Sequence, residues 1–215
     1  MKKFLNFLRR FFNNRVLFCD LDGTLIVTKS GKTFPKDEND WKFKPGICYA
    51  IRQYNPKYIF IISNQGGIEK GFVDEKKFIA KMKAIVSEIR TWGNYIVDYN
   101  YCKSNDPTHP YRKPNDGMIH DFKHNYADGY DFSNKDALMI GDASGKEGQF
   151  SDSDIQCAKN AGIRYCDVDD FIEASNPCNT CTITSLCGDA AYEPFLPCYL
   201  SYRERLKMVI ENHKN

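Results

Sequence analysis

Two aspartates separated by a single residue follow a short apolar run near the start of the chain. The run from Val16 to Cys19 is typical of a buried strand, and Asp20 and Asp22 come directly after it. Side chains at i and i+2 of an extended chain point to the same side, so both carboxylates can act on one group. One can attack phosphorus while the other protonates the leaving oxygen and then activates water. The pair indicates phosphoryl transfer, although Asp-Gly after a strand is also a common turn.

Polar residues that suit a bound phosphate lie in three further places. Gly23 lets the backbone turn closely around a phosphate, and Thr24 follows it. Ser63 and Asn64 open a glycine-rich turn after a second apolar run, where a hydroxyl suits a phosphoryl oxygen. Lys113 lies in a later Tyr-Arg-Lys-Pro segment, where a fixed cation can neutralise both the attacking carboxylate and the phosphoryl group. Taken singly, each segment also fits an ordinary polar loop.

Two acidic residues near the fourth apolar run are candidates for holding a metal ion. Asp142 follows that run after Gly141, and Asp154 opens a helical pattern. Magnesium binds hard oxygen ligands, often one or two carboxylates together with waters and phosphate oxygens. We therefore expect Mg²⁺ as a cofactor, with Asp142 and Asp20 as ligands and Asp154 in an outer position around the ion.

Short apolar runs alternate with helical patterns along the chain. The expected strands are 16–19, 58–62, 96–102 and 137–140, and the expected helices are 45–54, 74–92, 116–125 and 154–161. This alternation predicts an α/β fold with a parallel sheet and helices on both faces. Ligands of such sheets bind outside the carboxyl ends of the strands. The polar residues described above follow those ends, so we expect them to meet at one edge.

The order of these residues resembles the haloacid dehalogenase (HAD) superfamily. Its phosphatases carry Asp-x-Asp-Gly-Thr, then Ser or Thr, then Lys, then Gly-Asp. The resemblance implies a Rossmann-like HAD fold, with Asp20 as the nucleophile that forms an aspartyl-phosphate. Asp22 is similar to the general acid/base, which also binds the metal through its backbone carbonyl. Ser63 and Lys113 match the positions that orient phosphate, and Asp142 matches the metal aspartate.

A narrower resemblance concerns the substrate. The segment Thr28-Lys-Ser-Gly-Lys-Thr-Phe-Pro35, followed by Asp40-Trp41, looks like the phosphatase domain of polynucleotide kinase 3′-phosphatase. Those enzymes remove 3′-phosphates from DNA ends, so the resemblance implies nucleic-acid 3′ ends as substrate and a role in DNA repair. Single-stranded ends are held by basic groups with an aromatic ring for stacking, for which Lys32, Phe34 and Arg112 are candidates.

Two other functions remain open. The Arg-Lys-Pro segment is shared with histidinol-phosphate and heptose-bisphosphate phosphatases, so a small-molecule phosphatase is one alternative. A catalytically idle binding module is a second, although the intact set of acidic, hydroxyl and lysine residues disfavours it. The short spacings between the motifs leave no room for a large cap domain, and an open site suits a polymer end. The formal net charge of +2 points to no particular partner.

We expect three parts in the chain of 215 residues. Residues 1–14 are basic and aromatic, and they suit either a short packed helix or a segment at a membrane surface. Residues 15–175 form the expected HAD phosphatase domain, and residues 176–215 form an extension with a final helix. Because Arg9 and Arg10 interrupt the first apolar run, we expect an intracellular protein, cytoplasmic or nuclear. The sequence leaves the oligomeric state open.

The extension carries four of the nine cysteines. These are Cys178, Cys181, Cys187 and Cys198. Four soft ligands are enough for a tetrahedral, structural Zn²⁺ site, although their spacing is irregular. Inert or redox-active thiols, an iron–sulfur cluster and a disulfide are the other interpretations.

Overall fold

A five-stranded parallel sheet forms the centre of the fold in the computed structural model, which describes residues 15–33, 35–125 and 132–175. The strands are β1 (Val16–Cys19), β4 (Tyr58–Asn64), β5 (Ile96–Cys102), β6 (Ala137–Gly141) and β7 (Arg164–Asp167). Their order across the sheet is β5-β4-β1-β6-β7, and every neighbouring pair is parallel. The first strand is therefore central, flanked by β4 and β6.

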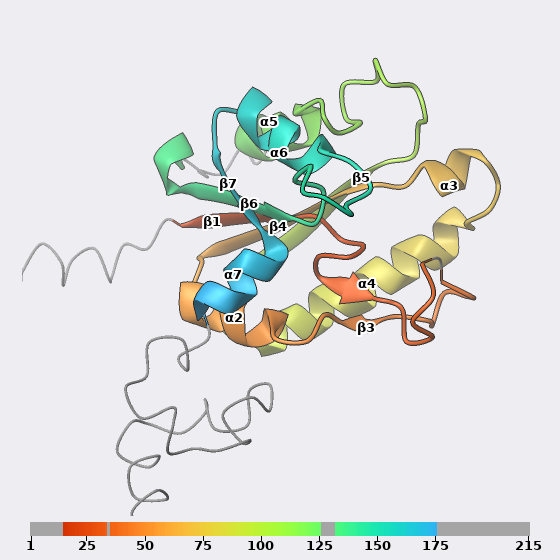
Figure 1. Ribbon diagram of the computed structural model, residues 1–215, viewed down its shortest axis with the longest axis horizontal. Coiled ribbons are helices and arrows are strands. Elements are labelled where there is room, and N and C mark those ends of the chain that lie inside the picture. Colours follow the sequence, from red (N-terminus) through yellow and green to blue (C-terminus); the bar gives the residue numbers. More distant parts are fainter. Residues whose placement is uncertain (1–14, 34, 126–131, 176–215) are drawn as a thin grey trace, which may run out of the picture.

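Helices cover both faces of this sheet (Figure 1). They are α2 (Ile47–Tyr54), α3 (Gly66–Glu69), α4 (Glu75–Thr91), α5 (Gly117–Asn125), α6 (Ser153–Asn160) and α7 (Val168–Ser175), with a short 3₁₀ turn at Asn134–Asp136. Buried side chains of α2, α4 and α7 share one core, and those of α5 and α6 share the other. The predicted α/β fold with a parallel sheet covered on both faces is confirmed.

The residues of β1 explain why its sequence is apolar without alternation. Leu17 and Cys19 face the core under α2, α4 and α7, whereas Val16 and Phe18 face the core under α5 and α6. All four are fully buried. A strand buried on both faces is apolar at every position, as is common in parallel sheets. Burial of the central strand fixes where the residue after it must lie.

A small antiparallel hairpin stands beside the main sheet. It pairs β2 (Ile26–Val27) with β3 (Lys42–Phe43), and the chain between these strands forms a loop over residues 28–41. This hairpin is short, so the described residues contain no large cap domain, as expected. The sequence patterns did not predict the hairpin, α3, β7 or α7, and they placed the ends of the expected helices within one or two residues.

Three expectations fall outside the described residues. They concern the segment 1–14, the extension 176–215 with its four cysteines, and Phe34. Within the part of the chain that the structure describes, no helix is long and apolar enough to cross a membrane.

Candidate active site

Asp20 occupies the carboxyl end of the central strand. Its backbone N–H donates to the carbonyl oxygen of Ile140 (3.0 Å), which continues the pairing of β1 with β6. The residue is buried, and its carboxylate Oδ1 accepts a hydrogen bond from Lys113 Nζ at 2.5 Å. The ion pair and the burial hold the Asp20 carboxylate in one orientation. A nucleophile requires such a fixed orientation toward its substrate.

Lys113 links two carboxylates from distant parts of the chain. Its Nζ also donates to Asp154 Oδ1 at 2.7 Å, and the lysine is buried. Burial alone would lower the pKa of Lys113, but the neighbouring Asp20 and Asp154 outweigh it and raise that pKa above its usual value. The ammonium group therefore stays charged throughout the working pH range.

Asn64 holds Lys113 in place through the main chain. The Asn64 side chain donates from Nδ2 to the Lys113 carbonyl and accepts at Oδ1 from the Lys113 N–H, both at 2.9 Å. The two bonds use the Nδ2 donor and the Oδ1 acceptor of the Asn64 side chain. In this structure Asn64 thus positions the lysine, and its expected contact with substrate stays a prediction.

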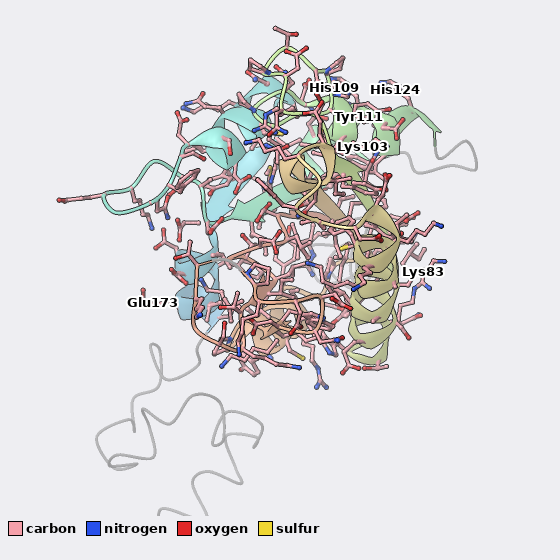
Figure 2. The ribbon with its side chains drawn as sticks, turned by 90° about the vertical axis from the view of Figure 1, so that its right-hand side faces the viewer. Lys83, Lys103, His109, Tyr111, His124 and Glu173 are labelled. Atoms are coloured by element: carbon pink, nitrogen blue, oxygen red, sulfur yellow. The ribbon has the colours of Figure 1, made fainter. Side chains whose placement is uncertain are left out.

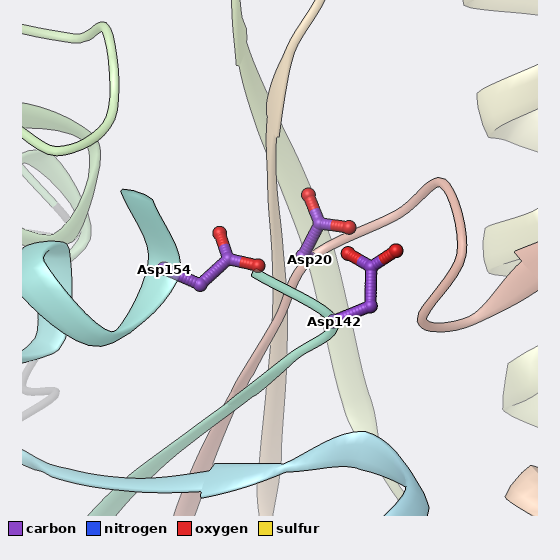
Figure 3. Close-up of side chains that lie close together, drawn as sticks. All are labelled: Asp20, Asp142 and Asp154. Atoms are coloured by element: carbon purple, nitrogen blue, oxygen red, sulfur yellow. The ribbon is translucent and has the colours of Figure 1, made fainter. Parts of the chain in front are cut away.

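Three carboxylates converge at the edge of the sheet (Figure 3). Oxygens of Asp20, Asp142 and Asp154 lie within 4.8 Å of one another. Burial raises the pKa of Asp20, and the nearby Asp154 and Asp142 raise it further while Lys113 opposes them. The pKa of Asp142 is raised as well, by burial first and then by Asp154. Lys113 contacts only Asp20 and Asp154, so the three acidic groups together make a site that favours an added cation.

Glycine permits the close approach of Asp142. Gly23 has a φ of 84°, a conformation that L side chains rarely adopt, and a Cβ at this position would collide with Asp142 Oδ2. A Cβ at Gly141 would likewise collide with the carboxylate of Asp154. The two glycines therefore let the acidic groups pack against backbone.

Asp22 lies apart from the carboxylate cluster. Its side chain is 55% exposed, and its Oδ2 accepts a hydrogen bond from Gln65 Nε2 at 2.6 Å. Lys81 of α4 lies 3.9 Å from its other oxygen. The same Gln65 amide donates to the buried Ser63 hydroxyl at 2.9 Å. Asp22 is therefore oriented and accessible to solvent, as a group that exchanges protons must be.

Two residues of this site were missed by the sequence analysis. Gln65 joins Asp22 to Ser63, and only its place in the glycine-rich turn hinted at a role. Lys44 donates from Nζ to the Gly23 carbonyl (3.1 Å) and forms an ion pair with Asp169 (2.8 Å). It thereby links the turn after β1 to the start of α7. No spacing pattern in the sequence connects Lys44 with that turn.

The hydroxyl of Thr24 is buried and has no hydrogen-bond partner among the described residues. A buried polar atom without a partner is costly, so such atoms usually find one. Thr24 lies one residue beyond Gly23, in the turn that borders the cluster. Its predicted contact with substrate stays a prediction.

The loop over residues 28–41 is organised by one carboxylate. Asp40 is buried and accepts hydrogen bonds from the Ser30 N–H (2.8 Å), the Ser30 hydroxyl (2.6 Å) and the Lys36 N–H (2.9 Å). These bonds, led by that from the Ser30 hydroxyl, lower the pKa of Asp40 to about 2. Lys32, the expected substrate contact, is exposed on this loop. The carboxylate thus gives an otherwise irregular loop one defined shape.

The loop lies along α4, next to Asp22. Glu38 of the loop pairs with Lys77 of α4 at 2.9 Å, and Lys81 lies one helical turn further on, beside Asp22. Residues four apart on a helix are neighbours on one face. The loop therefore lies close to Asp22.

Arg112 belongs to a second loop that follows β5. Its guanidinium donates to the Ser104 carbonyl at 2.8 Å, inside that loop. Asn105 fastens the loop to α3 by donating to the Gly66 carbonyl at 2.8 Å. Figure 2 shows Lys103, His109 and Tyr111 of this loop close together in the upper part of the view. Arg112 therefore supports the loop, and contact with substrate stays a prediction for it.

Comparisons with known proteins agree with this geometry. The profile of the family described as "Polynucleotide kinase 3 phosphatase" matches residues 15–172. The bifunctional polynucleotide phosphatase/kinase of Schizosaccharomyces pombe is 34% identical over 149 residues, which are 68% of this chain and 34% of that protein. The D-glycero-beta-D-manno-heptose-1,7-bisphosphate 7-phosphatase of Rhodopseudomonas palustris is 32% identical over 136 residues, 57% of this chain and 67% of that protein.

A solved structure supports the fold. The D,D-heptose 1,7-bisphosphate phosphatase of B. bronchiseptica, complexed with magnesium and phosphate, superposes with a TM-score of 0.52 and 19% identity, covering 77% of this chain and 98% of that one. The chain belongs to the Polynucleotide kinase 3 phosphatase family, and it is a phosphatase of the HAD type.

Proposed function

We propose that this protein is a Mg²⁺-dependent phosphomonoesterase that removes the 3′-phosphate from DNA ends through an aspartyl-phosphate on Asp20. The observation that carries the substrate is the family match over residues 15–172, which includes the loop at 28–41. We further propose residues 15–175 as the catalytic domain.

Asp20 and Asp22 divide the reaction in this proposal. A carboxylate oxygen of Asp20 attacks phosphorus, the bond from phosphorus to the leaving oxygen breaks, and Asp22 gives that oxygen its proton. Asp22 then takes a proton from water as the water oxygen attacks the phosphorus of the aspartyl-phosphate. Inorganic phosphate leaves, and the Asp20 carboxylate is restored. The exposure of Asp22 and its hydrogen bond from Gln65 support this role.

Lys113 and Ser63 orient the phosphoryl group. The lysine lies at hydrogen-bond distance from Asp20, so its charge is available to the oxygens that surround the attacked phosphorus. Ser63 is buried beside Gln65 and has a hydroxyl to offer to one of those oxygens. Both groups are fixed before substrate binds, which reduces the reorganisation that the reaction requires.

The carboxylate cluster fits Mg²⁺. Asp20, Asp142 and Asp154 offer hard oxygens within 4.8 Å of one another, and Lys113 alone balances them only in part. When bound, Mg²⁺ supplies positive charge that offsets these carboxylates and the phosphate oxygens. The backbone carbonyl of Asp22 is a further proposed ligand. The magnesium and phosphate bound to the B. bronchiseptica phosphatase are consistent with this cofactor.

The features of loop 28–41 support a nucleic-acid substrate. The loop is irregular, yet Asp40 holds it in one shape beside Asp22, with Lys32 exposed on it. The short hairpin that carries it leaves the site without a large cap among the described residues. An open site with a fixed, partly basic wall suits the end of a polymer.

The second candidate is a sugar-phosphate phosphatase. The heptose-bisphosphate phosphatase of Rhodopseudomonas palustris is nearly as similar as the polynucleotide relative, and it aligns over a larger share of its own length. The catalytic groups above would serve either substrate. The two proposals differ only in what carries the phosphate.

A substrate panel tests the proposal. We would measure kcat/KM for a 3′-phosphorylated oligodeoxynucleotide, its 5′-phosphorylated counterpart, heptose 1,7-bisphosphate and histidinol phosphate, with Mg²⁺ and with EDTA. The 3′-phosphorylated oligonucleotide should give the highest value, and EDTA should abolish turnover. The Asp20→Asn variant, purified in parallel, controls for contaminating phosphatases. Preference for either small molecule would overturn the DNA assignment.

A further inference from the structure

Two histidines lie about one helical turn apart on α5. His120 and His124 are four positions apart in the sequence, a spacing that brings side chains to the same face of a helix. Their rings are parallel to within 6°, and the ring centroids lie 5.7 Å apart. Both residues are exposed, and Figure 2 shows His124 at the upper right of the view. The pair is therefore open to a ligand that arrives from solvent.

This pair lies apart from the core and from the carboxylate cluster. Other side chains of the same helix, Met118, Ile119 and Phe122, are buried in the core under α5 and α6. The two histidines are exposed, so they lie on the side of the helix that faces solvent. The cluster formed by Asp20, Asp142 and Asp154 contains neither of them. The proposed reaction at Asp20 thus leaves the histidine pair without a role.

A carboxylate holds the first of the two rings. Asp116 directly precedes α5, and its Oδ2 lies 3.0 Å from His120 Nε2. The backbone carbonyl of Asp116 also accepts from the His120 N–H at 3.0 Å. A neutral imidazole that donates its Nε2–H to a carboxylate presents a lone pair at Nδ1. His120 therefore has one oriented ring nitrogen to offer to a metal ion.

The distance between the rings suits one shared ion. Zn–N bonds are about 2.1 Å long, so an ion bound in the plane of an imidazole lies about 3 Å from the ring centre. Two rings whose centres lie up to about 6 Å apart can then share one ion. The 5.7 Å between His120 and His124 is within that range. Rotation about the bond from Cβ to the ring is soft, so exposed rings can turn a nitrogen toward the ion.

The donor atoms select the class of ion. Imidazole nitrogen suits Zn²⁺, Cu²⁺ and Ni²⁺, whereas Mg²⁺ prefers the oxygens of carboxylates, carbonyls and water. Histidines at i and i+4 on one helix face are a known arrangement for binding zinc. A carboxylate that accepts from the other ring nitrogen orients the ring and makes it a stronger ligand. Asp116 has this position relative to His120.

We propose that His120 and His124 bind one transition-metal ion of the Zn²⁺, Cu²⁺ or Ni²⁺ class, and that Asp116 positions His120 for it. Water completes the coordination, because the site is exposed. The bound ion links two successive turns of α5, so it stabilises the folded protein. The site is independent of the substrate and of the proposed Mg²⁺ site, since it uses other residues and other donor atoms.

Titration with Cu²⁺ alone tests the proposal, because Cu²⁺ binds nitrogen ligands more strongly than the other two ions. Calorimetry of the full chain should detect a site that is lost in His120→Gln and equally in His124→Gln. Electron paramagnetic resonance should show coupling to two imidazole nitrogens in the unaltered protein only. Zn²⁺ should raise the melting temperature of the unaltered protein but of neither variant, and Mg²⁺ should not distinguish the three proteins.

Two further variants serve as controls. Lys123→Gln changes an exposed side chain between the two histidines and should bind Cu²⁺ as the unaltered protein does. Asp116→Asn should keep the site but weaken it by about 10- to 100-fold, the usual effect of losing a carboxylate behind a ligating histidine. All variants retain the carboxylate cluster and the cysteines of the extension, so any metal bound there cancels in the comparison.

The outcomes decide the proposal without reference to enzyme activity. Unchanged stoichiometry and affinity in both glutamine variants would refute it, as would loss of the site in only one of them. A loss of binding in Lys123→Gln as large as in the glutamine variants would show that the ion does not recognise the histidines. A Cu²⁺ spectrum of the unaltered protein without two nitrogen ligands would overturn the site whatever the variants do. Because both histidines are exposed, circular dichroism should report an unchanged fold in their variants.

Discussion

Asp20 and Asp40 are both buried aspartates, and their surroundings move their pKa values in opposite directions. Asp20 lies among Asp142 and Asp154 with one lysine to share, so burial and like charges raise its pKa. Asp40 accepts three hydrogen bonds from its own loop, which lower its pKa to about 2. The carboxylate cluster around Asp20 concentrates negative charge, whereas the charge of Asp40 holds the loop in one shape.

This contrast has opposite consequences for stability. For Asp20 the folded state binds its proton more tightly than the unfolded chain does, so stability falls as pH rises from 3.8 toward about 8. For Asp40 the folded state binds its proton more weakly, so its contribution is present above 3.8 and is lost as pH falls toward about 2. Asp20 should therefore destabilise the metal-free protein at neutral pH, and Asp40 should stabilise it.

The largest expected effect is that of Asp20→Asn. Turnover should fall by about four orders of magnitude or more, because the variant lacks the proposed nucleophile. In metal-free buffer at pH 8, however, the melting temperature should rise by about 2 °C or more, since one of three crowded carboxylates is removed. Activity assays and calorimetry measure the two quantities. A lower melting temperature for the variant would contradict the charge argument.

Lys113→Met should lose both activity and stability. Its removal leaves Asp20 and Asp154 buried without their shared cation, and breaking a buried ion pair in this way costs about 3–5 kcal/mol. Urea denaturation measures the change, with Asp20→Asn as the matched control. Equal stability of the two variants would show that the lysine does not compensate the cluster.

Asp40→Asn should affect polymer substrates selectively. The loop loses acceptors for Ser30 and Lys36, so kcat/KM for the 3′-phosphorylated oligonucleotide should fall by about tenfold, while hydrolysis of p-nitrophenyl phosphate is unchanged. The variant should also be less stable than the unaltered protein at pH 7, with the difference vanishing near pH 2. An equal loss on both substrates would argue that Asp40 supports the catalytic centre instead.

Glu38→Gln should have the smallest effect. Glu38 is a carboxylate of the same loop, but its pair with Lys77 is solvent-exposed, and such pairs contribute little. We expect unchanged stability and unchanged kcat/KM for both substrates in the assays used for Asp40. A loss as large as that of Asp40→Asn would mean that any charge on this loop matters, and the contrast between the two carboxylates would disappear.

Apolar runs and helical spacing were enough to predict four of the five strands of the sheet (β1, β4, β5 and β6) and the helices α2, α4, α5 and α6. The sequence analysis did not predict β7, because this edge strand is only partly buried. Its sequence, Arg-Tyr-Cys-Asp, therefore contains no apolar run. The hairpin strands β2 and β3 are two residues long, too short for any periodicity. Patterns of burial thus predict central elements well and peripheral ones poorly.

The candidate site shows a similar division. The sequence named the residues directly after the strands, because parallel strands bring their carboxyl ends to one edge. It missed Gln65 and Lys44, whose partners Asp22 and Gly23 lie about 43 and 21 residues away along the chain. Asp40 was noticed only as part of a resemblance, since its three hydrogen bonds exist only in the folded loop.

The paired hydrogen bonds between Asn64 and Lys113 join two segments that are 49 residues apart in the chain. Lys113 reaches Asp20 only when both segments have packed on the sheet, so a half-assembled chain lacks the proposed catalytic centre. Enzyme activity therefore reports on cooperative folding. During gradual denaturation, loss of turnover should coincide with loss of the whole tertiary structure, without an active, partly loosened species in between.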